Sequence, residues 1–326
     1  MSTAIGLVGL GWIGDSHLTD LAARADVEIR ALCDLDAGRT AEFAGRYDAR
    51  ACKDVDELLA TELDAVWICT PPQHHLAPAR QAFARGIPVY LEKPVARDLA
   101  EATELTRLAE ESGVVCAVGY QWRALELLDA VRSELKSSDV VSLSGYSVGP
   151  TAARPWFLDQ AQGGGNLLER GSHQIDLARA VAGEVESVFA VGSTVRVDRP
   201  GVAARDIDDA LTLVLRMTNG AVATIVIAWT PADVSGRYGL DVVTDSGLLR
   251  VALDPEFRLT GRNRGLEVSA GVAEEPFSAS NSRFLAAVKA GDPAAVACTP
   301  ADALATLRVA LAGEEALATG RTVTLS

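Results

Sequence analysis

The stretch that decides the fold runs from Ala4 to Gly14, AIGLVGLGWIG, where an apolar run leads directly into three spaced glycines. The apolar run predicts a buried strand, and the residues that follow it predict an amphipathic helix. Glycines at this spacing between a strand and a helix are typical of a dinucleotide-binding turn. The three glycines allow, in turn, a tight bend, close approach of the backbone to a pyrophosphate, and close packing of the helix. We therefore predict that the cofactor phosphates face the helix amides of a turn formed by Gly9, Gly11, Trp12, Ile13 and Gly14.

A carboxylate stands at the end of the next predicted strand, Val27–Asp34. Asp34 lies 20 residues beyond Gly14, a position from which it would accept hydrogen bonds from the adenosine ribose hydroxyls. The same negative charge would repel a 2′-phosphate, so the sequence favours NAD over NADP. Arg39 lies close enough along the chain to pair with such a phosphate, and use of NADP therefore stays open.

The first third of the chain alternates short apolar runs with longer helical patterns, which indicates βαβ units and a parallel sheet covered by helices. Two helices are well delimited, because each ends at a glycine: His75–Arg85 before Gly86 and Leu99–Ser112 before Gly113. We predict a Rossmann domain over residues 1–120, with strands at Ala4–Gly9, Val27–Asp34, Ala65–Thr70, Pro88–Glu92 and Val114–Gly119.

The pattern changes after residue 120, and we predict a second, α+β domain over residues 121–326. A helix at Leu125–Lys136 and a glycine-rich loop with a further helix precede a run of strands, some joined by the turn pairs Asn219-Gly220 and Ser246-Gly247. The predicted strands are Val188–Val197, Leu211–Met217, Val222–Trp229, Leu240–Thr244 and Leu248–Leu253. Helical patterns return at Ser282–Lys289 and Pro300–Thr319, and the C-terminal helix can pack back on the first domain.

Composition excludes several classes of protein. The 326 residues are 48% hydrophobic and 23% charged, as in ordinary globular proteins. A net charge of −14 and a pI of about 4.8 would repel nucleic acid and anionic membranes. We find neither an export signal nor a membrane span, and the five irregularly spaced cysteines suit reduced thiols in the cytoplasm. None of the cysteines is assigned a redox or metal-binding role, and no metal site is predicted.

Four motifs together identify a family resemblance. They are the glycine turn, Thr70-Pro71 with His75, Glu92-Lys93-Pro94, and the segment Gly163–Asp176, GGGNLLERGSHQID. Over nearly its whole length the chain resembles the Gfo/Idh/MocA family of glucose-fructose oxidoreductases, inositol dehydrogenases and rhizopine catabolism proteins. The resemblance implies an open-faced, mostly antiparallel mixed sheet in the second domain, which often forms the interface of a dimer or tetramer. It also assigns to the cofactor-binding loops Thr70, Pro71, His75, Glu92 and Lys93.

The resemblance further implies that Lys93 acts with a histidine of the second domain and with a carboxylate four residues before it. Here these residues are His173 and Glu169, where the family usually has Asp. An alcohol is a very weak acid that must lose its proton as hydride leaves, so a base near neutral pKa is needed. His173 suits that role, Lys93 suits stabilisation of the developing oxygen charge, and Glu169 suits orientation of imidazole or substrate. The predicted substrate contacts are Lys93, Arg123, Trp156, Glu169 and His173.

Other polar and aromatic residues near these motifs are as consistent with packing as with a polyol pocket: Tyr120, Gln121, Trp122, Arg154 and Asp159. His17 is expected to pack or to hydrogen-bond locally rather than to catalyse, and Asp176 to stabilise the helix of His173. The predicted activity is NAD(P)-dependent oxidation or reduction at a secondary hydroxyl or carbonyl of a sugar, inositol or related polyol. Two alternatives stay open: a non-catalytic dinucleotide or sugar sensor, which the presence of Lys93 and His173 disfavours, and an NAD-retaining lyase or glycosidase that uses transient oxidation.

Overall fold

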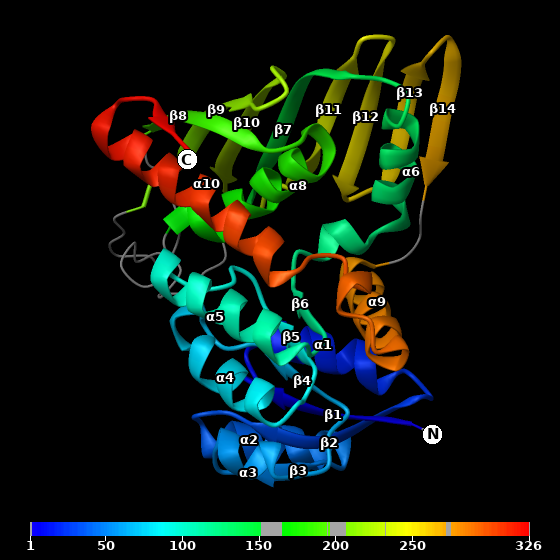
Figure 1. Ribbon diagram of the computed structural model, residues 1–326, viewed down its shortest axis with the longest axis vertical. Coiled ribbons are helices and arrows are strands. Elements are labelled where there is room, and N and C mark those ends of the chain that lie inside the picture. Colours follow the sequence, from blue (N-terminus) through cyan, green and yellow to red (C-terminus); the bar gives the residue numbers. More distant parts are fainter. Residues whose placement is uncertain are drawn as a thin grey trace. The chain divides into compact units, whose positions relative to one another are not determined.

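The computed structural model describes residues 2–150, 165–193, 195, 207–231, 233–271 and 275–325. These residues divide into two compact units, each with its own sheet (Figure 1). The first unit comprises Met1–Ala124 and Glu274–Leu304, and the second comprises Leu125–Ala273 and Ala305–Ser326. Among the described residues, no helix is both long and apolar enough to cross a membrane.

The first unit is built on a six-stranded parallel sheet with the strand order β3-β2-β1-β4-β5-β6, which is the order of a Rossmann fold. The predicted fold class is thereby confirmed for this part of the chain. The strands are β1 (Thr3–Val8), β2 (Val27–Cys33), β3 (Arg50–Cys52), β4 (Ala65–Ile68), β5 (Val89–Leu91) and β6 (Cys116–Val118). The sequence did not predict β3, because it has only three residues, of which two are exposed.

Helices of the first unit connect these strands, and their ends follow local sequence signals. Asp36, Asp54 and Asp98 each cap a helix N-terminus by accepting a hydrogen bond from a backbone amide, and Gly113 ends a helix with φ of +65°. The helices are α1 (Trp12–Ala22), α2 (Ala37–Tyr47), α3 (Val55–Leu59), α4 (Leu76–Ala84), α5 (Leu99–Ser112) and α9 (Pro276–Ala290), with short turns η1 (Pro72–His74), η2 (Gln121–Ala124) and η5 (Pro293–Ala295).

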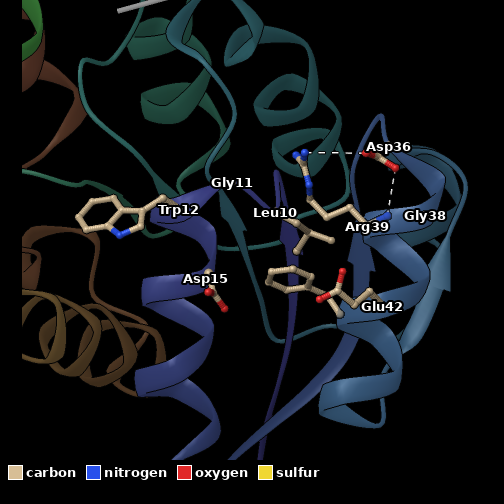
Figure 2. A pocket seen from close by; sticks show the side chains of 9 residues that line it. Leu10, Gly11, Trp12, Asp15, Asp36, Gly38, Arg39 and Glu42 are labelled. Carbon is tan, nitrogen blue, oxygen red and sulfur yellow. Dashed lines mark hydrogen bonds and ion pairs between the residues drawn. The ribbon is translucent and has the colours of Figure 1, made fainter. Parts of the chain in front are cut away.

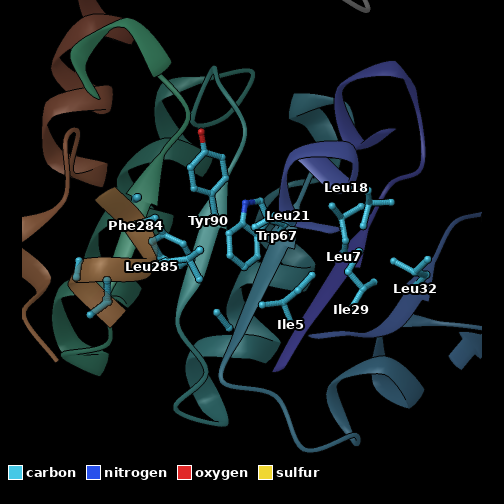
Figure 3. Packing of buried hydrophobic residues seen from close by; sticks show 14 of the residues in the cluster. Ile5, Leu7, Leu18, Leu21, Ile29, Leu32, Trp67, Tyr90, Phe284 and Leu285 are labelled. Carbon is cyan, nitrogen blue, oxygen red and sulfur yellow. The ribbon is translucent and has the colours of Figure 1, made fainter. Parts of the chain in front are cut away.

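Helix α9 lies far along the sequence, in the part assigned above to the second domain, but the structure packs it into the core of the first unit. Phe284 is 1% exposed and meets the rings of Trp67 and Tyr90 at centroid distances of 5.0 and 5.5 Å (Figure 3). Leu285 is buried in the same cluster. Burial of these apolar side chains against β4 and β5 is the physical reason that α9 joins the Rossmann unit.

The second unit contains a nine-stranded mixed sheet with the order β14-β13-β12-β11-β7-β10-β9-β8-β15, in which only the β7–β10 pair is parallel among the described residues. This mostly antiparallel sheet confirms the predicted architecture. Its strands are β7 (Val140–Pro150), β8 (Val185–Ser193), β9 (Ala210–Met217), β10 (Val222–Thr230), β11 (Arg237–Thr244), β12 (Gly247–Asp254), β13 (Arg258–Asn263), β14 (Leu266–Gly271) and β15 (Val323–Thr324).

Helices of the second unit cover one face of this sheet. They are α6 (Glu126–Leu135), α8 (Ser172–Ala182) and α10 (Pro300–Thr319), of which the portion from Ala305 onward belongs to this unit. Along β10 the residues Ala223, Ile225 and Ile227 are fully buried, whereas Val222 and Val226 are exposed. Among the described residues, this alternation leaves the opposite face of the sheet uncovered.

The central strand β7 was not predicted from the sequence. Its buried face alternates small residues, Gly145, Ser147 and Gly149, which weaken the apolar pattern of a strand. The structure explains them by close approach: a Cβ atom on Gly145 would lie 2.8 Å from Gln174 Oε1 of α8. The helix that follows the glycine-rich loop can therefore rest directly on this strand.

Candidate active site

The glycine turn of the first unit has the geometry that a pyrophosphate requires. Gly9 has φ of +94°, and a Cβ on it would lie 2.7 Å from the carbonyl carbon of Cys69. A Cβ on Gly14 would lie 2.1 Å from the Gly9 carbonyl oxygen, so the first turn of α1 packs against the turn itself. Gly11, in contrast, has open space where its side chain would be, and no side chain caps the helix there. The uncapped start of α1 thus provides an accessible cradle for phosphate groups.

Asp34 is held next to this cradle by the backbone of the turn. Its Oδ2 accepts a hydrogen bond of 2.7 Å from the Leu10 amide, and its Oδ1 accepts one of 2.9 Å from the Asp36 amide. The Arg39 guanidinium lies 3.7 Å from Asp34 Oδ1 and 3.8 Å from Asp36 Oδ2. The Asp34 carboxylate is therefore fixed in position. The Arg39 guanidinium lies close enough to this site to interact with an anion bound there.

Arg39 and Trp12 border a cavity of about 570 Å³ between the starts of α1 and α2 (Figure 2). Figure 2 shows Trp12 extending away from Arg39, at the opposite side of the opening. Trp12 is 60% exposed. The remaining lining residues are Leu10, Gly11, Asp15, Asp36, Gly38, Glu42 and Phe43. Of these, only Gly11 was predicted as a site residue from the sequence, although the acidic Asp36, two positions after Asp34, was a usable signal.

The residues present fit a dinucleotide. The open space beside Gly11 suits a pyrophosphate. The Asp34 carboxylate is placed so that it can accept hydrogen bonds from ribose hydroxyls. The cavity size lies within the range of small-molecule and cofactor sites, about 300–1,000 Å³.

Thr70, Pro71 and His75 lie where β4 ends, next to the glycine turn. His75 is completely buried, and its Nε2 donates a hydrogen bond of 2.8 Å to the Thr70 carbonyl while Nδ1 lies 3.3 Å from the Val95 carbonyl. Burial lowers the pKa of His75, although its carbonyl partners partly offset that effect. His75 thus contributes to the cofactor loops by joining the loop after β4 to the loop after β5.

Lys93 follows β5 and is partly exposed, with a cis peptide bond to Pro94 of the kind that the Lys-Pro sequence allows. The preceding Glu92 is 5% exposed, and its Oε2 accepts a hydrogen bond of 3.1 Å from the Lys93 amide. A Cβ on Gly119, at the end of the neighbouring β6, would lie 2.6 Å from Glu92 Oε1. Glycine at that position therefore makes room for the carboxylate.

His17 packs and hydrogen-bonds in the core of the first unit, but its partners are distant in the sequence rather than local. It is fully buried in α1, and its ring nitrogens lie 2.8 Å from Asn281 Oδ1 of α9 and 3.1 Å from Glu92 Oε1. The sequence contains no signal for these contacts, because α9 lies more than 250 residues beyond His17.

Glu169 and His173 lie together at the start of α8 in the second unit. Leu167–Gly171 forms a π-helical turn, η4, that runs directly into α8, and π turns occur often at functional sites. Glu169, Arg170 and His173 are partly exposed, while the neighbours Gly171, Ser172 and Gln174 are buried. The side chains of Glu169 and His173 are thus partly accessible within a segment that is mostly buried.

Arg170 anchors this turn to the sheet. Its guanidinium stacks on the Trp229 ring at 4.4 Å, donates a hydrogen bond of 3.0 Å to the Gly149 carbonyl and contacts the Tyr238 hydroxyl. Burial lowers the pKa of Arg170. These contacts with β7, β10 and β11 restrain the backbone that carries Glu169 and His173.

The other predicted site residues are placed as follows. Arg123 is 6% exposed and pairs with Asp302 at 3.4 Å in the first unit, and its substrate contact stays a prediction. Asp176 accepts a hydrogen bond of 3.0 Å from Thr306 of α10, which ties α8 to that helix. Outside the described residues lie Arg154, Trp156 and Asp159.

Two stretches of the chain match models of a known oxidoreductase family. Residues 3–120 match a model described as the oxidoreductase family with an NAD-binding Rossmann fold, and residues 139–250 match the GFO/IDH/MocA C-terminal domain. The chain is 30% identical to inositol 2-dehydrogenase 2 from Saccharopolyspora erythraea over 82% of this chain and 78% of that protein. It is 26% identical to the uncharacterized oxidoreductase YrbE from Bacillus subtilis, over 68% of this chain and 65% of the relative. The crystal structure of GenD2 from gentamicin A biosynthesis, in complex with NAD, superposes with a TM-score of 0.83 at 25% identity, covering 100% of this chain and 97% of that one.

Proposed function

The chain belongs to the Gfo/Idh/MocA family and is an NAD-binding oxidoreductase, and from that premise we propose that it acts on a sugar, inositol or related polyol. In this proposal it oxidises a secondary hydroxyl or reduces the corresponding carbonyl. The observation that carries the proposal is the accessible pair Glu169 and His173 on a restrained π-helical turn. The name of the inositol 2-dehydrogenase relative supports the substrate class.

We assign the catalytic steps to three side chains. His173 removes the hydroxyl proton during oxidation and returns it during reduction, because an imidazole titrates near neutral pH. Lys93 stabilises the negative charge that develops on the substrate oxygen. Glu169 orients the imidazole or a neighbouring substrate hydroxyl, over a reach about one bond longer than that of Asp. When bound, NAD supplies the nicotinamide C4 that accepts the hydride.

We assign NAD as the preferred dinucleotide. Asp34 is fixed by the Leu10 and Asp36 amides at a place that suits ribose hydroxyls, and its charge opposes a 2′-phosphate. Arg39 is already engaged by Asp34 and Asp36 on both sides, which reduces its availability to such a phosphate.

We also propose that the uncovered face of the second sheet forms a homodimer or homotetramer interface. Apolar side chains on neighbouring strands of that face are substantially exposed, at 36% for Phe189, 53% for Val191, 44% for Val214 and 39% for Val226. Phe189 and Val214 are cross-strand partners, so these residues form a continuous patch. Val226→Glu is expected to shift the protein to a smaller species in light scattering after size exclusion, and unchanged mass would contradict the interface.

A substrate screen tests the function. The purified protein would be offered sugars, inositols and sugar acids with NAD and then NADP, and the absorbance of the reduced nicotinamide would be followed. Lys93→Ala and His173→Ala are expected to lose turnover, and His74→Ala, which alters an exposed histidine of η1, serves as the matched control. Tight cofactor binding without any turnover would favour the sensor. Conversion of substrate without net redox change would favour the lyase or glycosidase.

A further inference from the structure

A chain of buried polar groups joins the cofactor helix α1 to the loop that carries Lys93. His17 Nδ1 lies 2.8 Å from Asn281 Oδ1, and His17 Nε2 lies 3.1 Å from Glu92 Oε1. Glu92 Oε2 in turn accepts the Lys93 amide hydrogen at 3.1 Å. All of these groups belong to the first unit.

The hydrogen bonds determine which way the Asn281 amide points. Its Oδ1 lies 3.0 Å from Trp67 Nε1, which can only donate, and its Nδ2 lies 2.8 Å from Asp20 Oδ2. Asp20 also receives hydrogen bonds from the Arg24 guanidinium on both of its oxygens, so Asp20 Oδ2 acts as an acceptor here. Asn281 therefore presents its oxygen to His17, and His17 Nδ1 must carry a hydrogen.

With the hydrogen on Nδ1 assigned, the remaining question is whether a further proton lies between His17 Nε2 and Glu92 Oε1. If the imidazole were neutral with its hydrogen on Nδ1, the bare Nε2 would face a Glu92 carboxylate oxygen, and two acceptors would be opposed. The pair is therefore satisfied only with one additional proton, on Nε2 or on Glu92. Since His17 is 0% and Glu92 5% exposed, water cannot easily supply the missing hydrogen bond.

From this proton count, and resting on the role proposed above for Lys93, we infer that His17 and Glu92 are positioning residues for Lys93 that act through one shared hydrogen. The shared hydrogen holds the Glu92 carboxyl in the space beside Gly119, where its second oxygen receives the Lys93 amide. Loss of the hydrogen releases Glu92 from α1 and lets the start of the Lys93 loop move. The hydrogen bonds thereby hold Lys93 at a fixed position relative to helix α1 of the dinucleotide-binding turn.

Nitrogen NMR tests the proton directly and needs no substrate. The chain has only four histidines, so 15N-histidine labelling gives a simple spectrum, and the spectrum of His17→Gln identifies the His17 signals. We expect His17 Nδ1 to be protonated, either as an imidazolium or as the Nδ1–H tautomer beside a protonated Glu92. A neutral His17 with a bare Nδ1 and a hydrogen on Nε2 would overturn the inference.

Kinetics then test the positioning. In Glu92→Gln the amide can donate to a neutral His17 and its oxygen can still accept the Lys93 amide, so Glu92→Gln is expected to keep clearly more activity than Glu92→Ala. His17→Gln and Glu92→Ala are expected to lower kcat by about 10- to 100-fold, as small displacements of catalytic groups do. The Kd for NAD is expected to change by less than about twofold in His17→Gln, because that substitution leaves the glycine cradle untouched.

Tyr90→Phe is the matched control, because it removes another buried hydrogen bond between β5 and α9, to Ser280 at 2.8 Å, without touching Lys93. It is expected to keep the wild-type kcat. Equal losses in Tyr90→Phe and His17→Gln, or wild-type kcat in His17→Gln, would overturn the positioning role.

A second readout separates this inference from the proposed function. The chain has four lysines, Lys53, Lys93, Lys136 and Lys289, whose 13C-methylated signals can be assigned by substitution. The Lys93 signal is expected to shift in His17→Gln and to stay in place in Tyr90→Phe. An unmoved Lys93 signal in His17→Gln would overturn the positioning role even if no substrate were found.

Discussion

Replacement of Asp34 by Asn would measure how strongly this carboxylate sets the choice of dinucleotide. Asn preserves the shape of the side chain, and its one oxygen can continue to accept the Leu10 amide, now at 2.7 Å. It removes the negative charge and one acceptor. The variant therefore tests recognition of the ribose while the glycine turn keeps its hydrogen bond.

The expected magnitude follows from hydrogen bonds to a charged group, which contribute about 1.5–3 kcal/mol each. Loss of one such bond to a ribose hydroxyl corresponds to a decrease of about 10- to 150-fold in affinity for NAD. Affinity for NADP should fall less or rise, because the repulsion of a 2′-phosphate disappears and Arg39, now 3.7 Å from Asp34, loses a competing partner. The preference for NAD over NADP should therefore shrink or invert.

Calorimetric titration with NADH and NADPH would measure both affinities. Asp15→Asn is the matched control, because Asp15 borders the same cavity and the change removes the same charge at the opposite helix. If removal of any negative charge near the cavity changed the dinucleotide affinity, both variants would show the same change in affinity. The reasoning fails if Asp34→Asn binds NADH within about twofold of wild type, or if Asp15→Asn loses as much affinity.

Three further perturbations test the remaining structure. Gly14→Ala, whose Cβ would meet the Gly9 oxygen at 2.1 Å, should cost about 1–3 kcal/mol of unfolding free energy as well as NAD affinity, whereas Gly11→Ala should keep the wild-type Tm and lose affinity alone. Equal Tm values for the two variants would contradict this. Burial lowers the pKa of His75 below 6.5, so the unfolded chain binds that proton more tightly. Its stabilising contribution is therefore full above about pH 6.5 and falls below it by at most about 1.4 kcal/mol per pH unit. Denaturant titrations from pH 5 to 8 should show this slope in wild type and a smaller one in His75→Gln, while parallel curves would refute it. Burial raises the pKa of Cys33 to about 11 and that of Cys116 to about 12, so both thiols should resist Ellman's reagent at pH 8 until the protein unfolds. Rapid labelling of either cysteine in the folded protein, located by peptide mapping, would contradict the burial.

Much of the fold could be predicted because its signals are local. The glycines of the first turn, the glycine after Ser112 and the apolar run Val27–Cys33 each specify conformation over a few residues. The helices predicted at Leu99–Ser112 and Pro300–Thr319 have those same bounds in the structure. The position of Asp34 beside the glycine turn could be predicted because its distance from that turn is set by one helix and one strand.

Signals for the sheet of the second unit were weaker. Central strand β7 carries glycines and serines on its buried face, since Gln174 of α8 approaches Gly145 too closely for a larger side chain. Its alternation therefore lacks the apolar contrast by which strands are recognised. The π-helical form of Leu167–Gly171 likewise has no sequence signal of its own.

The sequence by itself determined the dinucleotide turn, the acidic residue beside it and the residue types available for proton transfer. These follow from backbone sterics and from side-chain chemistry, which act over a few positions. Only the tertiary structure decided that α9 completes the core of the Rossmann unit, that Arg123 pairs with Asp302, and that His17 meets Glu92. Such contacts join residues that are far apart in the chain. They form because burial of apolar surface also buries polar groups, which must then find hydrogen-bond partners among the groups buried beside them.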